Sequence, residues 1–574
     1  MLTAASACGD AATPSTSSTG TTSTGATTST TSTTSTSSTT STSSTSTGEG
    51  GSGGAGTGGA GAGGSATGGG GGSSCGTRIE CAATWEQAAT DALDGLASGP
   101  PDALAAFLKA MPKGGDLHNH LSGAVYAETY LDWAKADGDC VNVSTHAAVF
   151  ANQCSATNQP TPSMGAFYDA IVHAWSMKDF VPGAENGHDH FFATFGKFGA
   201  VAGAHRDDSL ADVAMRAYDE NQLYVETMFN LGKSIGALSA SISSGPLTAQ
   251  NLPGLYASIL AAPTFDAELA KDVAVVTSAQ AAYRETLGCN DLSPPAVCDV
   301  EIRFVAQVAR TGAKDTVFGQ LIGAYEMAIK TNGIVALNLS SPEDDSTSLA
   351  NYDLHMAMLD FLYKQYTVTK KSPLHVTLHA GELTPEFLPP AYPNANTFHI
   401  RSAVELGHAE RIGHGLDILS EIDAQGLLAE LHDKNVLVEV CLSSNTQILK
   451  VQGAAHPLAT YLQNQVPVAL ATDDQGVSRS SLAGEHLRGV LDQNLRYRQL
   501  KAMARDSLEH AFLPGPSLWS SISQVTPVAD CAPTATMWLG DSPDAVCQAF
   551  LATSERATKQ WTLERGFTEF ESQQ

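Results

Sequence analysis

Basic side chains are scarce in this sequence. Its 31 Lys and Arg residues stand against 59 Asp and Glu residues, which gives a formal net charge of −28. Such a charge argues against a nucleic-acid backbone or an anionic membrane surface as the main partner. Long apolar runs are lacking as well, and none approaches the roughly 18 residues that a membrane-spanning helix needs. Hydrophobic residues still make up 42% of the 574 residues, which is ample for a large buried core.

Cysteine is sparse too, but the positions of the ten cysteines are informative. Eight of them form four local pairs: Cys75/Cys81, Cys140/Cys154, Cys289/Cys298 and Cys531/Cys547. Short-range pairs of this kind predict disulfides that close surface loops, and therefore an oxidising compartment. The alternative is a set of free thiols in a cytosolic protein. Cys441 is left over, and we interpret it as a small buried thiol because no paired base accompanies it.

The first 74 residues have little that could form a core. The start, "MLTAASACGD", places Cys8 after small residues, as at a bacterial lipoprotein processing site. The apolar stretch before it is shorter than the ~7–15 residues of a signal core, so we interpret residues 1–10 as the remnant of a lipoprotein signal whose true start lies upstream. Residues 11–74 are Ser/Thr-rich and then Gly-rich, which predicts a disordered linker. We therefore expect an extracytoplasmic protein (periplasmic, cell-surface or secreted), tethered through a lipid at Cys8 or carrying a plain low-complexity tail.

The rest of the chain alternates short apolar runs with helical stretches. The strand candidates are "GGDLHNH" (114–120), "LYVETMFN" (223–230), "VEIRFVAQV" (300–308), "GIVALNL" (333–339), "LHVTLHAG" (374–381), "RIGHG" (411–415), "VLVEVCLSS" (436–444) and "PVALATDD" (467–474). This alternation predicts an α/β fold of the TIM type, a (β/α)8 barrel, over residues 75–515. An open doubly wound sheet is the alternative, but no glycine-rich phosphate fingerprint follows the first strand. Residues 516–574 should form a C-terminal extension clipped by a disulfide.

Two connections in this barrel are unusually long. Large helical insertions are expected after strands 1 and 2, and we expect them to cover the mouth of the barrel. The first contains a second His-x-His pair, His188 and His190, in "NGHDHFFATF". Residues two apart on a helix point in different directions, so we interpret both histidines as solvated or as lining a lid. Glu226, inside the second strand, is interpreted as a buried carboxylate paired with a basic group.

Polar residues gather where strands end, which is where barrel enzymes place their catalytic groups. They are His118 and His120 (first strand), His379 and Glu382 (fifth), His414 (sixth), and Asp473 and Asp474 (eighth). Alternate residues on a strand face the same way, so His118 and His120 can reach one metal. Three histidines and a carboxylate suit Zn²⁺ with an open position for water, although another divalent transition metal could take the same ligands. Glu382 could then move a proton, and His414 could orient the water or act as a base.

The motifs "DLHNHLSGA", "LHAGE", "RIGHG", "CLSSN" and "ATDDQGVSR" follow one another in this order. Together they resemble the adenosine deaminase family of the amidohydrolase superfamily, over about residues 105–515. The resemblance implies one Zn²⁺ held by His118, His120, His379 and Asp473. It also implies that Glu382 protonates N1 of the purine, that His414 activates and positions the water, and that Asp474 engages N7. The implied reaction is the hydrolysis of adenosine, and of 2′-deoxyadenosine, to inosine and ammonia by a zinc-activated water.

Two positions depart from the family pattern. Ser122 stands where many members have an aspartate that approaches the ribose 5′-hydroxyl, and Ser341 stands near a glycine whose backbone N–H binds N3. Other aminopurines therefore stay open as substrates: an N6-modified adenosine, adenine or AMP, although no phosphate clamp is evident. A non-catalytic surface nucleoside-binding protein is a further alternative, which the intact set of proton-transfer residues disfavours. The H-x-E and P-C-x-x-C signature of the unrelated zinc deaminases is missing.

Overall fold

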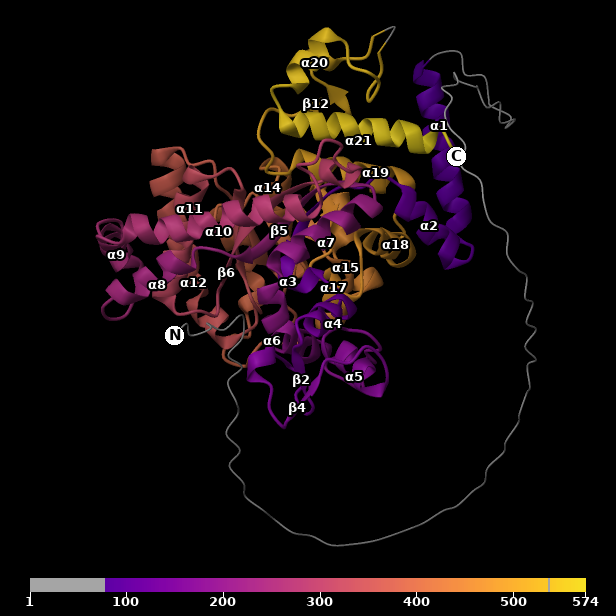
Figure 1. The fold of residues 1–574 in the computed structure, drawn as a ribbon. Coiled ribbons are helices and arrows are strands. Elements are labelled where there is room, and N and C mark those ends of the chain that lie inside the picture. Colours follow the sequence, from indigo (N-terminus) through magenta and orange to yellow (C-terminus); the bar gives the residue numbers. More distant parts are fainter. Residues whose placement is uncertain (1–77, 535–536) are drawn as a thin grey trace, which may run out of the picture. The chain divides into compact units, whose positions relative to one another are not determined.

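The structure is a computed structural model that describes residues 78–534 and 537–574 (Figure 1). The predictions for residues 1–10, for Cys8, for the linker 11–74 and for Cys75 lie outside these residues. Cys81 is disulfide-bonded. Three further predicted disulfides are confirmed, namely Cys140–Cys154, Cys289–Cys298 and Cys531–Cys547.

A parallel eight-stranded sheet forms the centre of the fold, with the strand order β1-β5-β6-β7-β8-β9-β10-β11. The strands are β1 (Gly114–His120), β5 (Gln222–Asn230), β6 (Glu301–Ala309), β7 (Ile334–Ser340), β8 (His375–Ala380), β9 (Arg411–His414), β10 (Leu437–Val440) and β11 (Val468–Leu470). The two edges meet just beyond β11, where His120 N donates to Asp473 O at 3.1 Å and Asp473 N donates to His118 O at 2.8 Å. The predicted (β/α)8 barrel is therefore confirmed.

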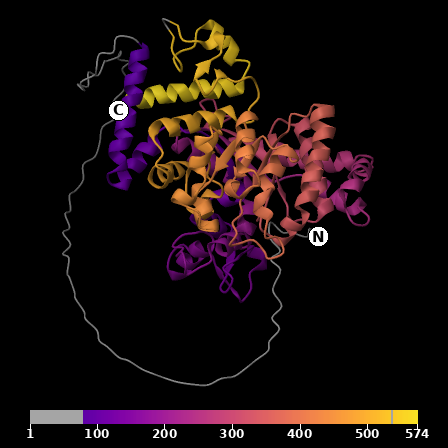
Figure 2. The same ribbon diagram turned by 180° about the vertical axis from the view of Figure 1, so that it is seen from behind.

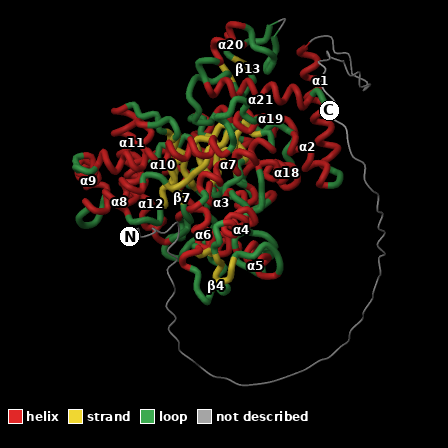
Figure 3. Tube along the Cα trace, viewed as in Figure 1, coloured by secondary structure: helices red, strands yellow, loops and turns green. Residues whose placement is uncertain are grey.

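The strands form where the sequence has short runs that can be buried on both faces, as parallel sheets covered by helices require. Every residue of β1 and of β7 is buried. Figure 3 shows the yellow strands enclosed by red helices. The helices that follow β6 to β11 are α11 (Lys314–Lys330), α12 (Ser346–Tyr363), α13 (His399–Glu405), α14 (Ala424–Asp433), α15 (Leu442–Leu449), α16 (Leu458–Gln463), α17 (Gln475–Ser478), α18 (Leu482–Gln493) and α19 (Tyr497–Glu509).

Two strands are shorter than predicted. We expected strands over 436–444 and 467–474, but β10 ends at Val440 and β11 ends at Leu470. The parallel register pairs Val440 with Leu470 as its last step, so the ladder between β10 and β11 ends there. The chain turns instead into α15 and α17, which places the polar residues of both segments at the barrel mouth.

The first insertion lies over the mouth, as expected. It contains α3 (Leu121–Ala124), α4 (Ala127–Ala136), β2 (Cys140–Asn142), β3 (Ala148–Val149), β4 (Asn158–Pro160), α5 (Ala166–Ala174), α6 (Gly187–Ala204) and α7 (Arg206–Asp219). Helix α6 packs against α15 and α17, the helices that leave the carboxyl ends of β10 and β11 (Figure 1). The hydrophobic core of the insertion, which includes Tyr130 and Phe198, continues into Ile448 of α15 and Val477 of α17.

The second insertion lies mainly elsewhere, which narrows our expectation that it also covers the mouth, although Lys233 and Asp272 border the cavity beside Ser122. It consists mainly of α8 (Lys233–Ile242), α9 (Leu252–Leu260) and α10 (Phe265–Thr286). Helix α8 packs against α11, and α10 packs against α7 and α8. Gly319 and Gly236 allow this close approach, because a Cβ at Gly319 would stand 2.4 Å from the Ser239 Cβ. The second insertion therefore thickens the outer helical layer.

The two ends of the described chain lie together. Helix α1 (Arg78–Ala97) precedes α2 (Pro101–Ala110), and the chain ends in β12 (Trp519–Ser521), β13 (Thr526–Pro527), α20 (Ala545–Leu551) and α21 (Glu555–Glu571). Helix α21 packs against α1 and α19, so the indigo and yellow ends of the chain are side by side in both views (Figures 1 and 2). Within the described ranges, no helix combines the length and apolar character needed to cross a bilayer.

Candidate metal centre

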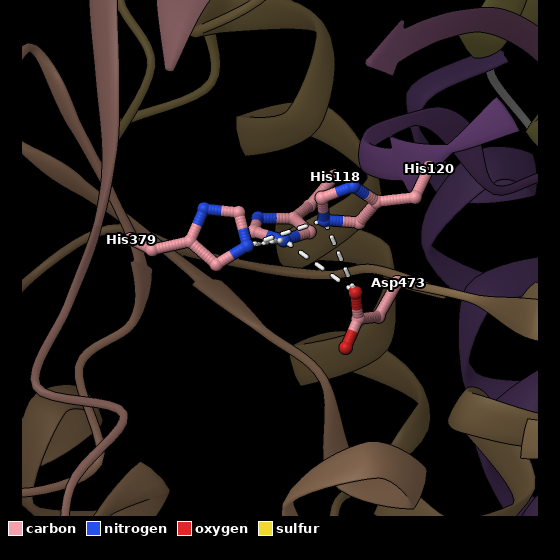
Figure 4. Close-up of side chains that lie close together, drawn as sticks. All are labelled: His118, His120, His379 and Asp473. Carbon is pink, nitrogen blue, oxygen red and sulfur yellow. Dashed lines mark hydrogen bonds and ion pairs between the residues drawn. The ribbon is translucent and has the colours of Figure 1, made fainter. Parts of the chain in front are cut away.

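Four donor atoms converge where β1, β8 and β11 end. The Nε2 atoms of His118 and His120 each lie 3.2 Å from Nε2 of His379. Asp473 Oδ1 lies 3.4 Å from His120 Nε2 and 3.8 Å from His118 Nε2. Figure 4 shows the three rings and the carboxylate pointing toward one another. Ligands about 2.0–2.1 Å from a tetrahedral zinc are about 3.3 Å apart, so the spacing fits a single small cation.

The far nitrogen of each ring is held by an oxygen. Nδ1 of His118 bonds Glu439 Oε2 at 2.6 Å, and Nδ1 of His379 bonds Asn338 Oδ1 at 2.7 Å. Nδ1 of His120 lies 3.4 Å from Gln307 Oε1. Because these oxygens accept, each Nδ1 carries the proton and each Nε2 presents a lone pair to the common point. The donor set and its tautomers therefore fit a divalent transition metal.

Glu439 links this centre to a buried ion-pair network. Its Oε1 accepts from Arg411 Nε at 2.6 Å and from Thr377 Oγ1 at 2.8 Å. Burial raises the pKa of Glu439, but Arg411 and the hydrogen-bonded His118 lower it more, to about 2. Arg411 also pairs with Glu226, which confirms the interpretation of Glu226 as a buried strand carboxylate. Through Glu439, this ion-pair network holds the His118 ring in place from inside the barrel.

Glu382 lies beside the donor set and is buried. Burial, followed by the charges of Asp473 and Glu343, raises the pKa of Glu382 well above its usual range, which favours the protonated form of this carboxyl. Its backbone is fixed by Glu343, which accepts from Glu382 N at 2.8 Å and from His399 Nδ1 at 2.6 Å. Glu382 can therefore donate a proton from a fixed position.

A chain of hydrogen bonds sets the tautomer of His414. Leu458 N donates to His456 Nδ1 at 3.1 Å, so His456 Nε2 carries a proton and donates to Asn445 Oδ1 at 3.2 Å. The Asn445 amide then donates to His414 Nδ1 at 3.1 Å. Burial, followed by the nearby His118, lowers the pKa of His414 to about 3, so the ring is neutral and its proton sits on Nε2.

The Nε2 proton of His414 faces the candidate metal centre. Nε2 of His414 is buried, lies 3.7 Å from Glu382 Oε1, and has no hydrogen-bond partner within the described part of the chain. His414 has φ of 68° and Asp473 has φ of 57°, conformations that cost non-glycine residues energy and often occur at functional sites. His414 is thus a preformed N–H donor aimed at whatever binds there.

Asp474 directly follows the ligand Asp473 and packs against Gly123. A Cβ at Gly123 would stand 1.8 Å from Asp474 Oδ1 and 2.6 Å from Asp474 Cβ, so only glycine fits. The two expected sugar and base contacts also follow strand ends. Ser122 is half-buried in α3, and Ser341 follows β7 with φ of 82°, a conformation that favours glycine.

The remaining polar residues near the mouth have simpler environments. His188 Nε2 lies 3.2 Å from Asp344 Oδ2, and its ring stacks on Phe387 at 5.2 Å, which agrees with a lid-lining side chain. His190 is half-buried in the same insertion and lies beside Glu185 and His173. Cys441 is a buried free thiol near His414 and Asp473, and burial raises the pKa of Cys441 well above its usual range. It therefore stays protonated, as expected of a structural cysteine.

Sequence reasoning found the converging residues but missed those that position them. The missed residues are Gly123, Gln307, Asn338, Glu343, Glu439, Asn445 and His456. A signal existed for Glu439 alone, since a carboxylate inside the apolar run "VLVEV" must have a buried partner. Gly123 lies only three residues after His120, and the others reach the site from strands and loops distant from the residues they position.

Comparisons with known proteins agree with this site. The family model described as adenosine deaminase matches residues 253–526. An adenosine deaminase of Yersinia enterocolitica is 29% identical over 228 residues, which cover 39% of this chain and 58% of the relative. One from Escherichia coli strain SE11 is 36% identical over 140 residues, covering 24% of this chain and 38% of the relative. The crystal structure of an arabidopsis N6-mAMP deaminase has a TM-score of 0.44 and 20% identity, covering 71% of this chain and 95% of that one.

The alignments with these curated relatives thus span less than two thirds of the relatives' own length. The residues that converge at the metal centre lie both inside the family match, as His379 and Asp473 do, and before it, as His118 and His120 do. Residues 253–526 therefore resemble the adenosine deaminase family, and the strand ends outside this match complete the same ligand set as those inside it.

Proposed function

We propose that this protein is a metal-dependent aminohydrolase that converts adenosine, and 2′-deoxyadenosine, to inosine and ammonia. The observation that carries the proposal is the convergence of His118, His120, His379 and Asp473, with a protonated Glu382 and an Nε2–H of His414 beside them. A nucleoside-binding protein has no need of a buried proton donor next to a metal site. The family match supports the same class of reaction.

Each residue has a distinct part in this reaction, in which a C6–O bond forms and the C6–N6 bond breaks. Zn²⁺ held by the four ligands would supply a water whose pKa is lowered toward 7. Glu382 gives its proton to N1, which makes C6 electrophilic, and the high pKa of Glu382 keeps that proton available at neutral pH. His414 donates its Nε2–H to the attacking oxygen and so orients it, and Asp474 contacts N7. One proton of the water passes to N6, so that the amine leaves as neutral ammonia, and the other returns to Glu382 when the C6 carbonyl forms, which restores the carboxyl.

We therefore propose that His414 is a donor that orients the attacking oxygen, which its hydrogen bond from Asn445 supports. A general base would need a lone pair on Nε2, but Asn445 already donates to Nδ1 and leaves the proton on Nε2. Because this donor is already in place, it does not have to reorient during the reaction. Such preorganisation is the usual source of electrostatic stabilisation in a buried site.

Replacing Gly123 with alanine is expected to lower kcat by roughly 10–100-fold, because a 1 Å misplacement of a positioning group can cost that much. The new methyl group would collide with the carboxylate and Cβ of Asp474, so the carboxylate must move. Steady-state deamination kinetics measure the effect. Gly196→Ala in α6 is the matched control, because nothing lies within 4 Å of its Cβ position. Unchanged kcat in Gly123→Ala would remove Asp474 from the reaction.

The test of the proposed function is an assay of ammonia release from the purified protein. Substrates are adenosine, 2′-deoxyadenosine, adenine, AMP and N6-methyladenosine, with methylamine measured for the last. We expect the highest kcat/KM with adenosine and 2′-deoxyadenosine, and loss of activity on chelation with recovery on addition of Zn²⁺. A metal-loaded protein that is inactive on all five compounds would instead favour the nucleoside-binding alternative.

One observation supports a 5′-substituted substrate as the second candidate. A cavity of about 290 Å³ lies beside Ser122, and its lining includes Arg206 and Lys233. A serine in place of aspartate removes a negative charge from this side, and the two basic residues could face a phosphate. The AMP arm of the assay decides between a nucleoside and a 5′-phosphorylated substrate. A kcat/KM for AMP above that for adenosine would make the nucleotide the substrate.

We further propose that the protein works outside the cytoplasm, and that a lipid at Cys8 anchors it. Three disulfides in the described residues support an oxidising compartment. Metabolic labelling with a radioactive fatty acid in a bacterial host should label the wild-type protein and not Cys8→Ser. An unlabelled wild-type protein in the culture medium would mean secretion without an anchor.

A further inference from the structure

Three side chains in the first insertion form a second cluster of metal-ligand type. His173 is at the end of α5, His190 is in the first turn of α6, and Glu185 is in the loop that joins these helices. Their donor atoms lie within 4.8 Å of one another. The cluster shares no residue with the donor set at the barrel mouth, and neither the proposed reaction nor the family match uses it.

Both imidazoles aim a nitrogen at the same carboxylate. His173 Nε2 lies 3.2 Å from Glu185 Oε1, and His190 Nδ1 lies 3.4 Å from Glu185 Oε2. The two ring centroids are 4.7 Å apart. Glu185 Oε2 is buried, yet among the described residues it has no hydrogen-bond donor.

The other nitrogen of each ring is already occupied by backbone carbonyls. His173 Nδ1 lies 2.7 Å from Lys178 O, and His190 Nε2 lies 3.0 Å from both His173 O and Ser176 O. A carbonyl only accepts, so these nitrogens carry the protons. In the neutral rings, His173 Nε2 and His190 Nδ1 then present lone pairs to a carboxylate that also has only lone pairs. The arrangement lacks a positive charge at its centre.

A different histidine of the same insertion shows what an ordinary ion pair looks like. His205 Nε2 lies 2.8 Å from Asp137, and its Nδ1 lies 2.7 Å from Asp208, so each ring nitrogen donates to a separate carboxylate. Among the described residues, no carbonyl holds the His205 ring in one tautomer, and no second imidazole shares a carboxylate with it. The His173–Glu185–His190 cluster differs on both points, and carbonyls that accept from the far ring nitrogen are a regular feature of metal-ligating histidines.

We propose that His173, His190 and Glu185 bind a divalent transition metal, with Zn²⁺ the best match to two imidazoles and one carboxylate. The ion supplies the missing positive charge between the lone pairs. The side chains of His173 and Glu185 are 32% and 34% exposed, so solvent can reach the cluster and water can complete the coordination. The site joins the end of α5 to the start of α6.

The position of this site gives it a structural role in the lid. The loop between its ligands contains Met177, whose backbone N–H donates to Val477 O at 2.8 Å, three residues beyond Asp474. Next to the loop, Gly187 packs so closely on Gln447 that a Cβ there would stand 2.0 Å from the Gln447 carbonyl oxygen. A metal that fixes residues 173–190 would therefore hold the first insertion against the barrel mouth.

The test is a count of zinc in the full-length protein. The protein is stripped with a chelator, loaded with ZnCl₂, separated from free metal by gel filtration and measured by mass spectrometry of the element. We expect two zinc ions per wild-type chain and one in Glu185→Gln or His173→Gln. His379→Gln should lose the other ion, and the double variant Glu185→Gln/His379→Gln should lose both.

Controls separate loss of the ion from loss of the fold. His205→Gln removes a histidine–carboxylate contact of the same insertion and should keep both ions. Far-UV circular dichroism in chelator checks that Glu185→Gln folds like the wild type. Hydrogen exchange gives a second measurement: Zn²⁺ should slow exchange in residues 175–186 of the wild type and not of Glu185→Gln.

Two results would overturn the proposal. One is a single zinc ion in the wild-type chain that is lost in His379→Gln. The His173–Glu185–His190 cluster would then be an ion pair of protonated histidines. The other is a second ion that persists in both Glu185→Gln and His173→Gln. Neither result bears on the proposed deaminase reaction, which depends on the ion held at the barrel mouth.

Discussion

Replacing Glu382 with glutamine is expected to lower kcat by about 10²–10⁴-fold, the range typical for loss of a general acid. Glutamine keeps the shape of the side chain but cannot give a proton to N1. Glu382 is not one of the four converging donors, so the variant should keep its metal. Deamination kinetics and the metal content of the same preparation measure both effects.

The matched control for this variant is Glu386→Gln. Glu386 is in the same loop after β8, but its side chain is 58% exposed and pairs with Lys450 at the surface. We expect its kcat to equal that of the wild type. Retention of activity in Glu382→Gln, with metal bound, would show that another group protonates the purine and would remove Glu382 from the mechanism.

The ligands at the barrel mouth could be predicted because the barrel turns sequence position into spatial position. Parallel strands end at one rim, so any residue just after a strand must lie near the residues after the other strands. His118 and Asp473 are far apart in sequence, yet the backbone bonds that close β1 against β11 bring them together. Alternation along β1 then turns both His118 and His120 inward. No tertiary information was needed beyond the order of the strands.

The residues that orient the ligands could not be predicted in the same way. Asn338 reaches His379 from the neighbouring strand, and Glu439 reaches His118 across the barrel interior. Which interior residues meet depends on strand tilt and register, and the sequence does not show these. The His173–Glu185–His190 cluster could not be predicted either, because its residues come together through an irregular loop that has no periodic pattern. We interpreted His190 from helix geometry alone, which does not show that Glu185 folds back toward it.

The positive φ of Ser341 connects the family's sequence pattern with the backbone geometry of this protein. The resemblance placed a glycine near this position, and the structure gives the serine a backbone conformation that glycine adopts freely. A family preference for glycine there thus has a physical reason, and its replacement by serine has a cost. The backbone N–H survives the change, so the expected contact with N3 remains a prediction that the backbone allows.

Replacing Glu439 with glutamine is expected to weaken zinc binding by about 10–100-fold, the usual cost of losing an outer-shell partner of a ligand. The side chain accepts from His118 and from Arg411, so the carboxylate both fixes the ligand's tautomer and neutralises a buried guanidinium. An amide has one oxygen and cannot serve both donors. A chelator competition titration with Zn²⁺ measures the change in affinity.

The same substitution should also lower the free energy of unfolding of the metal-free protein, by about 3 kcal/mol, because it leaves a buried charge with one partner fewer. Glu226 still pairs with Arg411, which keeps the loss at the low end of the range for broken buried pairs. Urea denaturation in chelator measures this loss separately from the loss of metal. Glu410→Gln is the matched control, because Glu410 adjoins Arg411 in sequence but is 51% exposed and pairs with His375. Its unfolding free energy should change by less than about 1 kcal/mol. If Glu439→Gln kept wild-type zinc affinity, Glu439 would not set the orientation of His118, and the ligand would be positioned by the strand alone.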